Sequence, residues 1–277
     1  MLALVTDSTC GLTRDEAREL GVDIVPMSYV ADGVRHAEGF VGETGDYADL
    51  FRRSHLVTSE AVRPSAVRRA LRPHLEAGAD VVCLTISSRL SGTFRGAEQA
   101  ARTLRAQYED GPQICVVDSW LTAGALEFMV RRARLRADQG VSLDEIVRDL
   151  ERERRARCIA FSVPDLRALH RSGRLGAFGR SVATKLNRYP VMLLEEGGIV
   201  EAGYGRGAHG MGTALVRLAG DGAHSFVISH FGERGVEAQQ LLVAVHERFP
   251  HAPVRVKDGG PVLAKHLGLG AVGLSWE

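Results

Sequence analysis

Short apolar runs alternate with stretches of helical periodicity along the first half of this chain. Residues 2–6, 81–86 and 114–117 are apolar and rich in β-branched side chains, which is typical of strands buried in a parallel sheet. Thr13 with Glu16, and Ser142 with Glu145, have the capping-box spacing that opens a helix. Helices are predicted over 13–20, 64–76, 93–107, 121–138 and 142–154, and an extended segment broken at Pro26 over 23–30.

The second half repeats this alternation. Strands are predicted at 158–161, 225–229, 254–256 and 271–274, and helices at 164–171, from the turn after Ser172 to about 187, at 210–219 and at 235–248. Residues 191–195 and 199–202 flank Gly197-Gly198, a sequence that favours a hairpin.

Regular alternation of strands and helices predicts the α/β class, with two α/β domains and largely parallel sheets. A charged helix end meets a new strand near residues 152–157. We therefore expect an N-terminal domain over 1–156 and a C-terminal domain over 157–277.

Composition is that of an ordinary globular protein, with 45% hydrophobic and 25% charged residues among 277. The 35 basic and 34 acidic residues leave a net charge of +1, which removes any global attraction to nucleic acid. Only Lys185, Lys257 and Lys265 are lysines, an arginine bias that we attribute to codon usage.

No apolar run reaches the ~18–20 residues that cross a bilayer, and the first residues lack a basic leader. These features predict a cytoplasmic protein without a membrane segment.

The sequence carries no strong motif for catalysis or metal binding. The four cysteines, Cys10, Cys83, Cys115 and Cys158, are scattered and form no C-x-x-C pair, so neither a metal nor a disulfide framework is indicated. There is no G-x-S-x-G, P-loop, H-E-x-x-H or dinucleotide fingerprint. We expect no cofactor and no autonomous enzyme.

Polar loops follow three predicted strands, at residues 7–9, 87–93 and 118–119, where α/β proteins bind ligands. Ser91 and Gly92 stand where a buried strand enters a helix, and free backbone N–H groups there suit an anion. Spacing alone equally allows Ser91 simply to cap the helix.

Three further positions have two interpretations each. The pair Thr58-Ser59 could bind a ligand or be ordinary loop polarity before a helix. Arg174 follows a glycine in a turn and could grip an acidic group or lie in solvent. His266, in a glycine-rich segment, could be a head-group ligand or a surface histidine on a turn.

Taken in order, these segments resemble the DegV family of bacterial fatty-acid-binding proteins. The matching pieces are TDSTC at 6–10, VTS at 57–59, ISSRLSGT at 86–93, VDS at 117–119, DLRALHRSGRL at 165–175 and the glycine-rich segment 260–270. Each piece is weak alone, but the ordered set is specific and spans nearly the whole chain. Two segments depart from the family pattern: residues 60–63 separate Ser59 from Pro64-Ser65, and residues 205–209 are less basic.

The resemblance implies a two-domain α/β protein that holds a long-chain fatty acid such as palmitate between its domains. It implies that Ser59 and Ser91 hold the carboxylate near His266, with Thr58 and Gly92 in the same set. Arg174 matches a family arginine near the head group. The acyl tail would occupy a tunnel in the C-terminal domain, and a separate fatty acid kinase would phosphorylate the carboxylate for phospholipid synthesis.

Two other functions stay open on the sequence alone. The strand-end loops around Asp7, Ser91 and Asp118 could belong to an enzyme that acts on a small anionic substrate. The chain could also be a regulatory module that senses acyl chains. The first would turn over substrate without a kinase, and the second would change a protein partner without phosphorylation.

Overall fold

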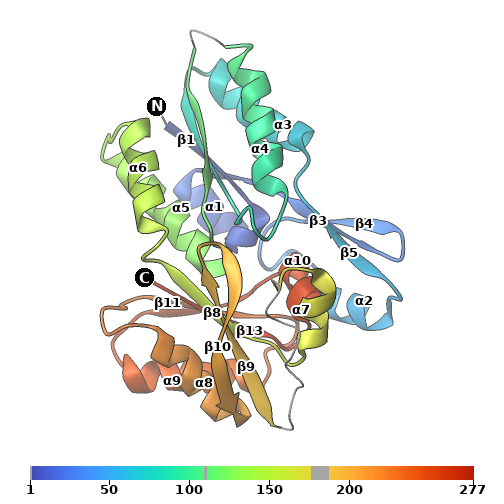
Figure 1. Ribbon diagram of the computed structural model, residues 1–277. Coiled ribbons are helices and arrows are strands. Elements are labelled where there is room, and N and C mark those ends of the chain that lie inside the picture. Colours follow the sequence, from blue (N-terminus) through green and yellow to red (C-terminus); the bar gives the residue numbers. More distant parts are fainter. Residues whose placement is uncertain (1, 109–110, 176–186) are drawn as a thin grey trace.

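The computed structural model describes residues 2–108, 111–175 and 187–277, and their strands form three sheets (Figure 1). Sheet A has the order β2-β1-β6-β7 and every pair in it is parallel. Its strands are β1 (Leu2–Asp7), β2 (Val22–Val25), β6 (Asp80–Thr85) and β7 (Ile114–Asp118). The apolar runs of the first half therefore form the parallel sheet that their composition predicts.

Helices cover both faces of sheet A, which explains why its strands are apolar throughout. Figure 1 shows α3 and α4 on one side, and α1, α5 and α6 on the other. These helices are α1 (Arg14–Leu20), α3 (Pro64–Glu76), α4 (Thr93–Arg105), α5 (Ala123–Asp138) and α6 (Leu143–Glu153). Both predicted capping boxes, at Thr13 and Ser142, are confirmed.

Sheet B is a small antiparallel sheet of order β4-β3-β5 that the sequence pattern did not predict. It consists of β3 (Met27–Ala31), β4 (Val34–Glu38) and β5 (Val57–Glu60), with α2 (Tyr47–Arg53) between the last two. The interpretation of Thr58-Ser59 as loop polarity is wrong, because both residues lie in β5 and pair with β3.

Sheet C contains six strands in the order β10-β9-β8-β13-β11-β12. They are β8 (Cys158–Ser162), β9 (Arg188–Glu195), β10 (Gly198–Arg206), β11 (Phe226–His230), β12 (Val254–Asp258) and β13 (Val272–Trp276). The hairpin at Gly197-Gly198 is confirmed.

The α/β class is confirmed, but the expectation of largely parallel sheets holds only for sheet A. In sheet C only β11 and β12 are parallel, and sheet B is antiparallel. The physical reason is connectivity: a short hairpin forces antiparallel neighbours, whereas parallel strands need a crossover segment. In addition, β13 lies between β8 and β11 and runs antiparallel to both.

Helix α5 is shared by sheets A and C. It contacts β1 on one side and β11 and β13 on the other. Gly124 permits this approach, because a Cβ there would come within 2.5 Å of the Val227 side chain. The buried core accordingly runs without a break from sheet A to residues of β8, such as Ile159 and Phe161.

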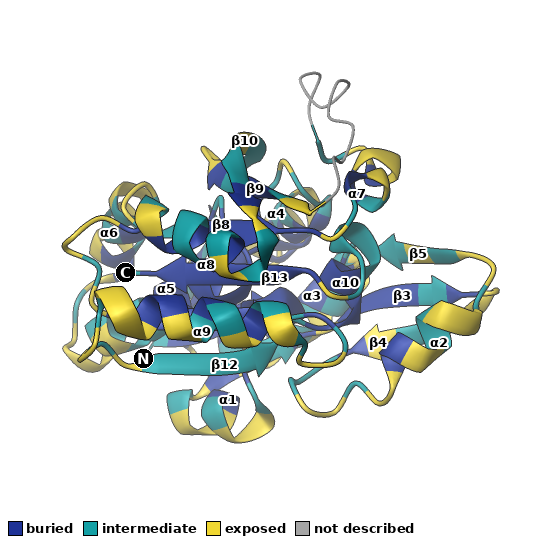
Figure 2. Cartoon of the chain, turned by 90° about the horizontal axis from the view of Figure 1, so that it is seen from below, coloured by how far each residue is buried: buried dark blue, intermediate teal, exposed yellow. Residues whose placement is uncertain are grey.

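The remaining helices are α7 (Leu166–Ser172), α8 (Gly207–Leu218), α9 (Val236–Arg248) and α10 (Pro261–Leu267). Figure 2 shows α8 and α9 beside sheet C, with buried residues facing the strands and exposed residues facing outward. The loop expected around His266 is instead helix α10, which Pro261 starts and Gly268, at φ 90°, ends. The helix predicted up to residue 187 lies outside the described residues.

All strands of sheets A and B precede residue 119, and all strands of sheet C follow residue 157. A domain boundary between 156 and 157 stays a prediction. In the part of the chain that the structure describes, no helix has both the length and the apolar character needed to span a bilayer.

Candidate ligand-binding site

One large cavity lies where elements of all three sheets meet. It contains about 830 Å³ of space free of atoms, part of it open to solvent. Most of its walls are apolar, contributed by Met27, Ala61, Ile86, Leu90, Ala123, Ile159, Phe161, Leu169, Leu194, Ile199, Phe231, Val262, Leu263 and Leu267. A mostly apolar cavity with a few converging polar groups is typical of small-molecule sites.

Five of the six predicted ligand-binding residues line this cavity: Ser59, Ser91, Gly92, Arg174 and His266. Thr58 does not, and its side chain is exposed. The reason is the two-residue alternation of a strand, which turns neighbouring side chains of β5 to opposite faces. No bound molecule is present, so the ligand-binding roles of these residues remain a proposal.

Ser59 and His266 are joined directly although they are 207 positions apart. Ser59 Oγ, on β5, lies 2.7 Å from His266 Nε2, on α10. This contact brings a residue of sheet B onto the helix that precedes β13, and it forms part of the polar end of the cavity.

His266 is held in its neutral form. Burial, together with the smaller effect of the positive charges of Lys265 and Arg174, lowers its pKa to about 3. Within the described residues its Nδ1 atom is buried and has no hydrogen-bond partner. A neutral imidazole at this position can share a proton with Ser59 but does not carry a positive charge at pH 7.

The Ser91 hydroxyl serves the start of α4 while facing the cavity. Its Oγ accepts from the Thr93 backbone N–H at 3.2 Å and lies 3.0 Å from Thr93 Oγ1. Thr93 Oγ1 in turn accepts from the Val62 N–H. The residue at the cap position is Gly92, which makes no side-chain bond. The capping interpretation of Ser91 is therefore right in part, and it does not remove the hydroxyl from the cavity wall.

Two aspartates, the buried Asp7 and the half-buried Asp118, hold the loop that carries Ser91. Asp7 Oδ2 accepts from the Ile86 N–H at 2.7 Å, and its other oxygen accepts from Thr9. Asp118 Oδ1 accepts from the Ser88 N–H at 3.0 Å. Burial raises the pKa of Asp7, and these bonds oppose that rise. Both carboxylates are occupied by the backbone, so they act here as loop supports.

Arg174 belongs to a group of cations near His266. Its Nε donates to the Leu90 carbonyl at 3.2 Å, and a second nitrogen contacts the Ser172 carbonyl. Burial lowers the pKa of Lys265, and the charges of Arg174 and Arg171 lower it further. Among the residues with described positions, none of these three cations has a carboxylate within 4 Å. As far as the described residues go, the polar end of the cavity is thus positive and its cations are not paired with carboxylates.

Glu38 does not line the cavity but supports it, and the sequence analysis missed this residue. It is only 3% exposed, and its oxygens accept from the Ser8 hydroxyl and from the Val262 N–H of α10, both at 2.8 Å. Burial raises its pKa to about 7. Glu38 thereby ties sheet B, which carries Ser59, to the helix that carries His266. Its place at the buried end of a mostly exposed strand gave no signal in the sequence.

Comparison with known proteins gives one consistent result. The family model described as "Uncharacterised protein, DegV family" matches residues 1–277. A DegV domain-containing protein of Mycobacterium tuberculosis is 31% identical over 280 residues, covering 99% of this chain and 96% of that protein.

Two solved structures are similar over almost their whole length. The structure described as "Fatty Acid Binding of a DegV family Protein from Thermus thermophilus" has a TM-score of 0.85 and 29% identity, covering 99% of this chain and 98% of that one. A stearic acid-binding protein from Eubacterium ventriosum has a TM-score of 0.85, with 100% and 98% coverage. At 22% identity it shows the fold.

Proposed function

Because the chain belongs to the DegV family, we propose that it binds a long-chain fatty acid and presents the carboxylate to a separate fatty acid kinase. The observation that carries this proposal is the cavity itself. Its walls are apolar, and its polar residues include two serines, a neutral histidine and an arginine. This polarity suits a ligand with a long apolar tail and one acidic head.

Head-group binding follows from the hydrogen-bond donors at that end. A buried carboxylate costs free energy unless it is hydrogen-bonded. The hydroxyls of Ser59 and Ser91 can donate to it, and Arg174 supplies positive charge nearby. The tail of a sixteen-carbon acid contributes ~0.8 kcal/mol per buried methylene, roughly 11 kcal/mol at most before association costs.

The same geometry argues against autonomous hydrolysis. Ser59 and His266 are as close as a nucleophile and its general base. A base that works at pH 7 needs a pKa near that value, whereas that of His266 is lowered to about 3. A pair of this kind hydrogen-bonds a carboxylate and leaves an acyl-phosphate intact. Since the kinase reaction consumes ATP, we place it in the cytoplasm.

An enzyme acting on a small anion at the strand-end loops is the second candidate. It needs a free acid or base there, but the Asp7 and Asp118 carboxylates accept bonds from the loop backbone. Turnover of a phosphoester or acyl ester without added kinase would favour this candidate.

Native mass spectrometry tests the lipid-binding part. We expect the protein, as isolated or after delipidation and addition of palmitate, to carry one acyl carboxylate per chain. Ser59→Ala should lose ligand, whereas Thr58→Ala, its exposed neighbour on the same strand, should retain it. Absence of both copurified lipid and palmitate uptake would contradict the proposal.

Arg174→Ala tests the presentation part. We expect this variant to keep most of its palmitate affinity and to lose kinase-dependent phosphorylation at least ~10-fold, because the arginine stabilises the added charge of the acyl-phosphate. The measurement is ATP-dependent acyl-phosphate formation at saturating palmitate. Turnover equal to that of the wild type would refute the role of Arg174.

A further inference from the structure

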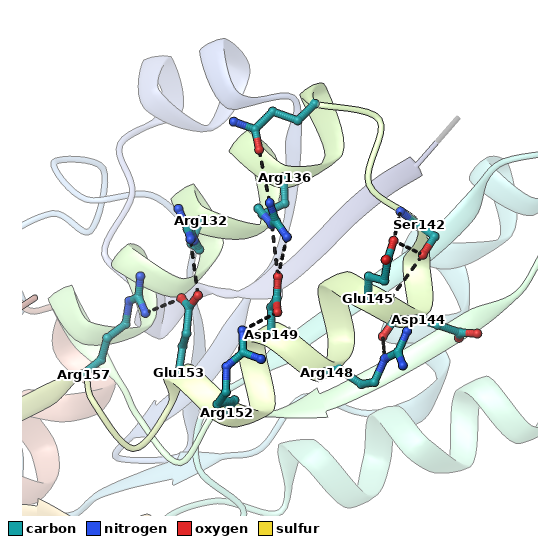
Figure 3. Close-up of polar contacts among 11 residues, drawn as sticks. Arg132, Arg136, Ser142, Asp144, Glu145, Arg148, Asp149, Arg152, Glu153 and Arg157 are labelled. Atoms are coloured by element: carbon teal, nitrogen blue, oxygen red, sulfur yellow. Dashed lines mark hydrogen bonds and ion pairs between the residues drawn. The ribbon is translucent and has the colours of Figure 1, made fainter.

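Two helix pairs of this chain contain the same number of arginines and use them differently. Helices α5 and α6 carry six arginines and seven carboxylates. Figure 3 shows how these groups are paired: Arg136 and Arg152 share Asp149, and Arg132 and Arg157 share Glu153. Arg131 and Arg134 have carboxylate partners as well. This helix pair neutralises its own charge.

Helices α3 and α4 also carry six arginines, but only two glutamates. In the described structure the arginines of these two helices make one ion pair, between Arg105 and Glu98 at 3.9 Å. Arg68, Arg69 and Arg95 have no carboxylate within 4 Å among the described residues. Because both helix pairs contain six arginines, codon usage does not explain why one of them is left positive.

The positive surface begins at the cavity. Figure 1 shows α3 and α4 side by side. Their first turns are in close contact, since a Cβ on Gly96 would lie 2.9 Å from the Val62 carbonyl. Ala61, which precedes α3, and Gly92, which precedes α4, both line the cavity. A partner that contacts the first turns of these helices would therefore lie next to the ligand site.

We propose that the outer surface of α3 and α4, formed by Arg68, Arg69, Arg72, Arg95 and Arg102 and called here the arginine face, docks an acidic surface of the protein that phosphorylates the bound ligand. The proposal rests on the proposed function. With a net charge of only +1, the chain as a whole exerts little pull on an acidic partner, so a local cluster is needed to steer and orient it. Arg69, Arg72, Arg95 and Arg102 are exposed and available for contact.

The test is a triple charge reversal, Arg68→Glu, Arg69→Glu and Arg95→Glu, in palmitate-loaded protein. The probe is a fatty acid kinase catalytic subunit, with binding measured without ATP and phosphorylation measured with ATP. The matched control reverses three exposed arginines elsewhere, Arg206, Arg217 and Arg234. We expect the triple variant to weaken binding and raise KM at least 10-fold, with kcat changed less than twofold and palmitate retained. The control should stay within twofold of wild type.

The outcomes separate this inference from the proposed function. Normal turnover with an unchanged KM in the triple variant would overturn the arginine face and leave lipid presentation supported. Wild-type binding that the triple variant loses, without any turnover, would support the face and contradict presentation. If the wild type neither binds the kinase subunit nor supports phosphorylation, both the arginine face and lipid presentation are contradicted. If the control variant loses as much binding as the triple variant, the docking site is not specific to the arginine face and the inference is wrong. If the wild type binds a short DNA duplex and the triple variant does not, the arginine face binds nucleic acid, and an acidic protein partner is contradicted.

Discussion

Two partly buried polar clusters of the described structure are built on opposite principles. Around Glu127, which is fully buried, each charge has a partner: Lys257 at 2.9 Å, Arg131 at 2.8 Å and Arg255 at 3.2 Å. Glu16 completes the cluster by pairing with Lys257 and Arg131. At the polar end of the cavity, Arg174 and Lys265 lie near a neutral His266. Neither cation has a carboxylate within 4 Å among the described residues.

Under the proposed function, the difference separates a cluster that serves the fold from one that binds a ligand. A buried charge is costly unless it is paired, and the Glu127 cluster meets this requirement within the protein. It joins α1 and α5 to β12, on either side of the expected domain boundary. The cations of the cavity cluster have no carboxylate within 4 Å among the described residues, and in the proposed function a ligand carboxylate supplies the anion.

Disrupting the cluster around Glu127 should have the largest effect of the changes predicted here, a loss of folding stability. Glu127→Ala leaves Arg131, Arg255 and Lys257 without their shared partner, and we expect it to lower the free energy of unfolding by about 3–5 kcal/mol. Chemical denaturation measures this. The control is Glu151→Ala, an exposed position on α6 that should change stability by less than ~0.5 kcal/mol. A loss below ~1 kcal/mol in Glu127→Ala would show that the cluster is not a structural lock.

Glu38 is an intermediate case: its buried carboxyl group is held by hydrogen bonds, and no cation lies within 4 Å of it among the described residues. Its pKa is raised from 4.5 to about 7 by burial, and nearby Asp7 and Asp258 add to the rise. Between these values the folded protein binds the proton more tightly than the unfolded chain does. The Glu38 contribution is therefore complete below about pH 4.5, and up to roughly 3 kcal/mol of it is lost as pH rises through 7.

Glu38→Gln tests this sign, because an amide copies the protonated acid and still accepts from Val262. We expect its free energy of unfolding to fall less than that of the wild type between pH 5 and pH 8, measured by urea denaturation at both values. Glu38→Ala should be destabilised at both pH values and should bind palmitate more weakly. Identical pH profiles for Glu38→Gln and the wild type would contradict the assignment.

Much of the fold was predictable because its signals are local. Apolar runs and capping boxes gave sheet A and its helices, and two glycines gave the hairpin of sheet C. Sheet B was missed because its strands are short and half-exposed, so that β4 and β5 lack a clear apolar alternation. Strand direction in sheet C was missed because it depends on where β13 inserts, which no local pattern reveals.

The site was predictable only in part. The family resemblance gave the polar residues, and five of the six named line the cavity. It did not give Glu38, whose role depends on a contact across 224 positions. Nor could it give the apolar walls, because Phe161 and Leu194 look like ordinary core residues until the fold leaves a space between them.

Of the predicted effects, the smallest should be that of Ser91→Ala on palmitate affinity. The Ser91 hydroxyl both caps the start of α4 and, in the proposed function, binds the ligand carboxylate. Removing its hydroxyl takes one donor from the ligand carboxylate, worth about 1–1.5 kcal/mol or roughly tenfold in Kd. The bond from the Thr93 N–H is also lost, so a small drop in stability, below ~1 kcal/mol, accompanies it. Ser88→Ala, on the same loop but outside the cavity wall, is the control. Palmitate titration of Ser91→Ala and Ser88→Ala compares them directly. If both bind as tightly as the wild type, the Ser91 hydroxyl belongs to the start of α4 alone and the head group is held by other donors.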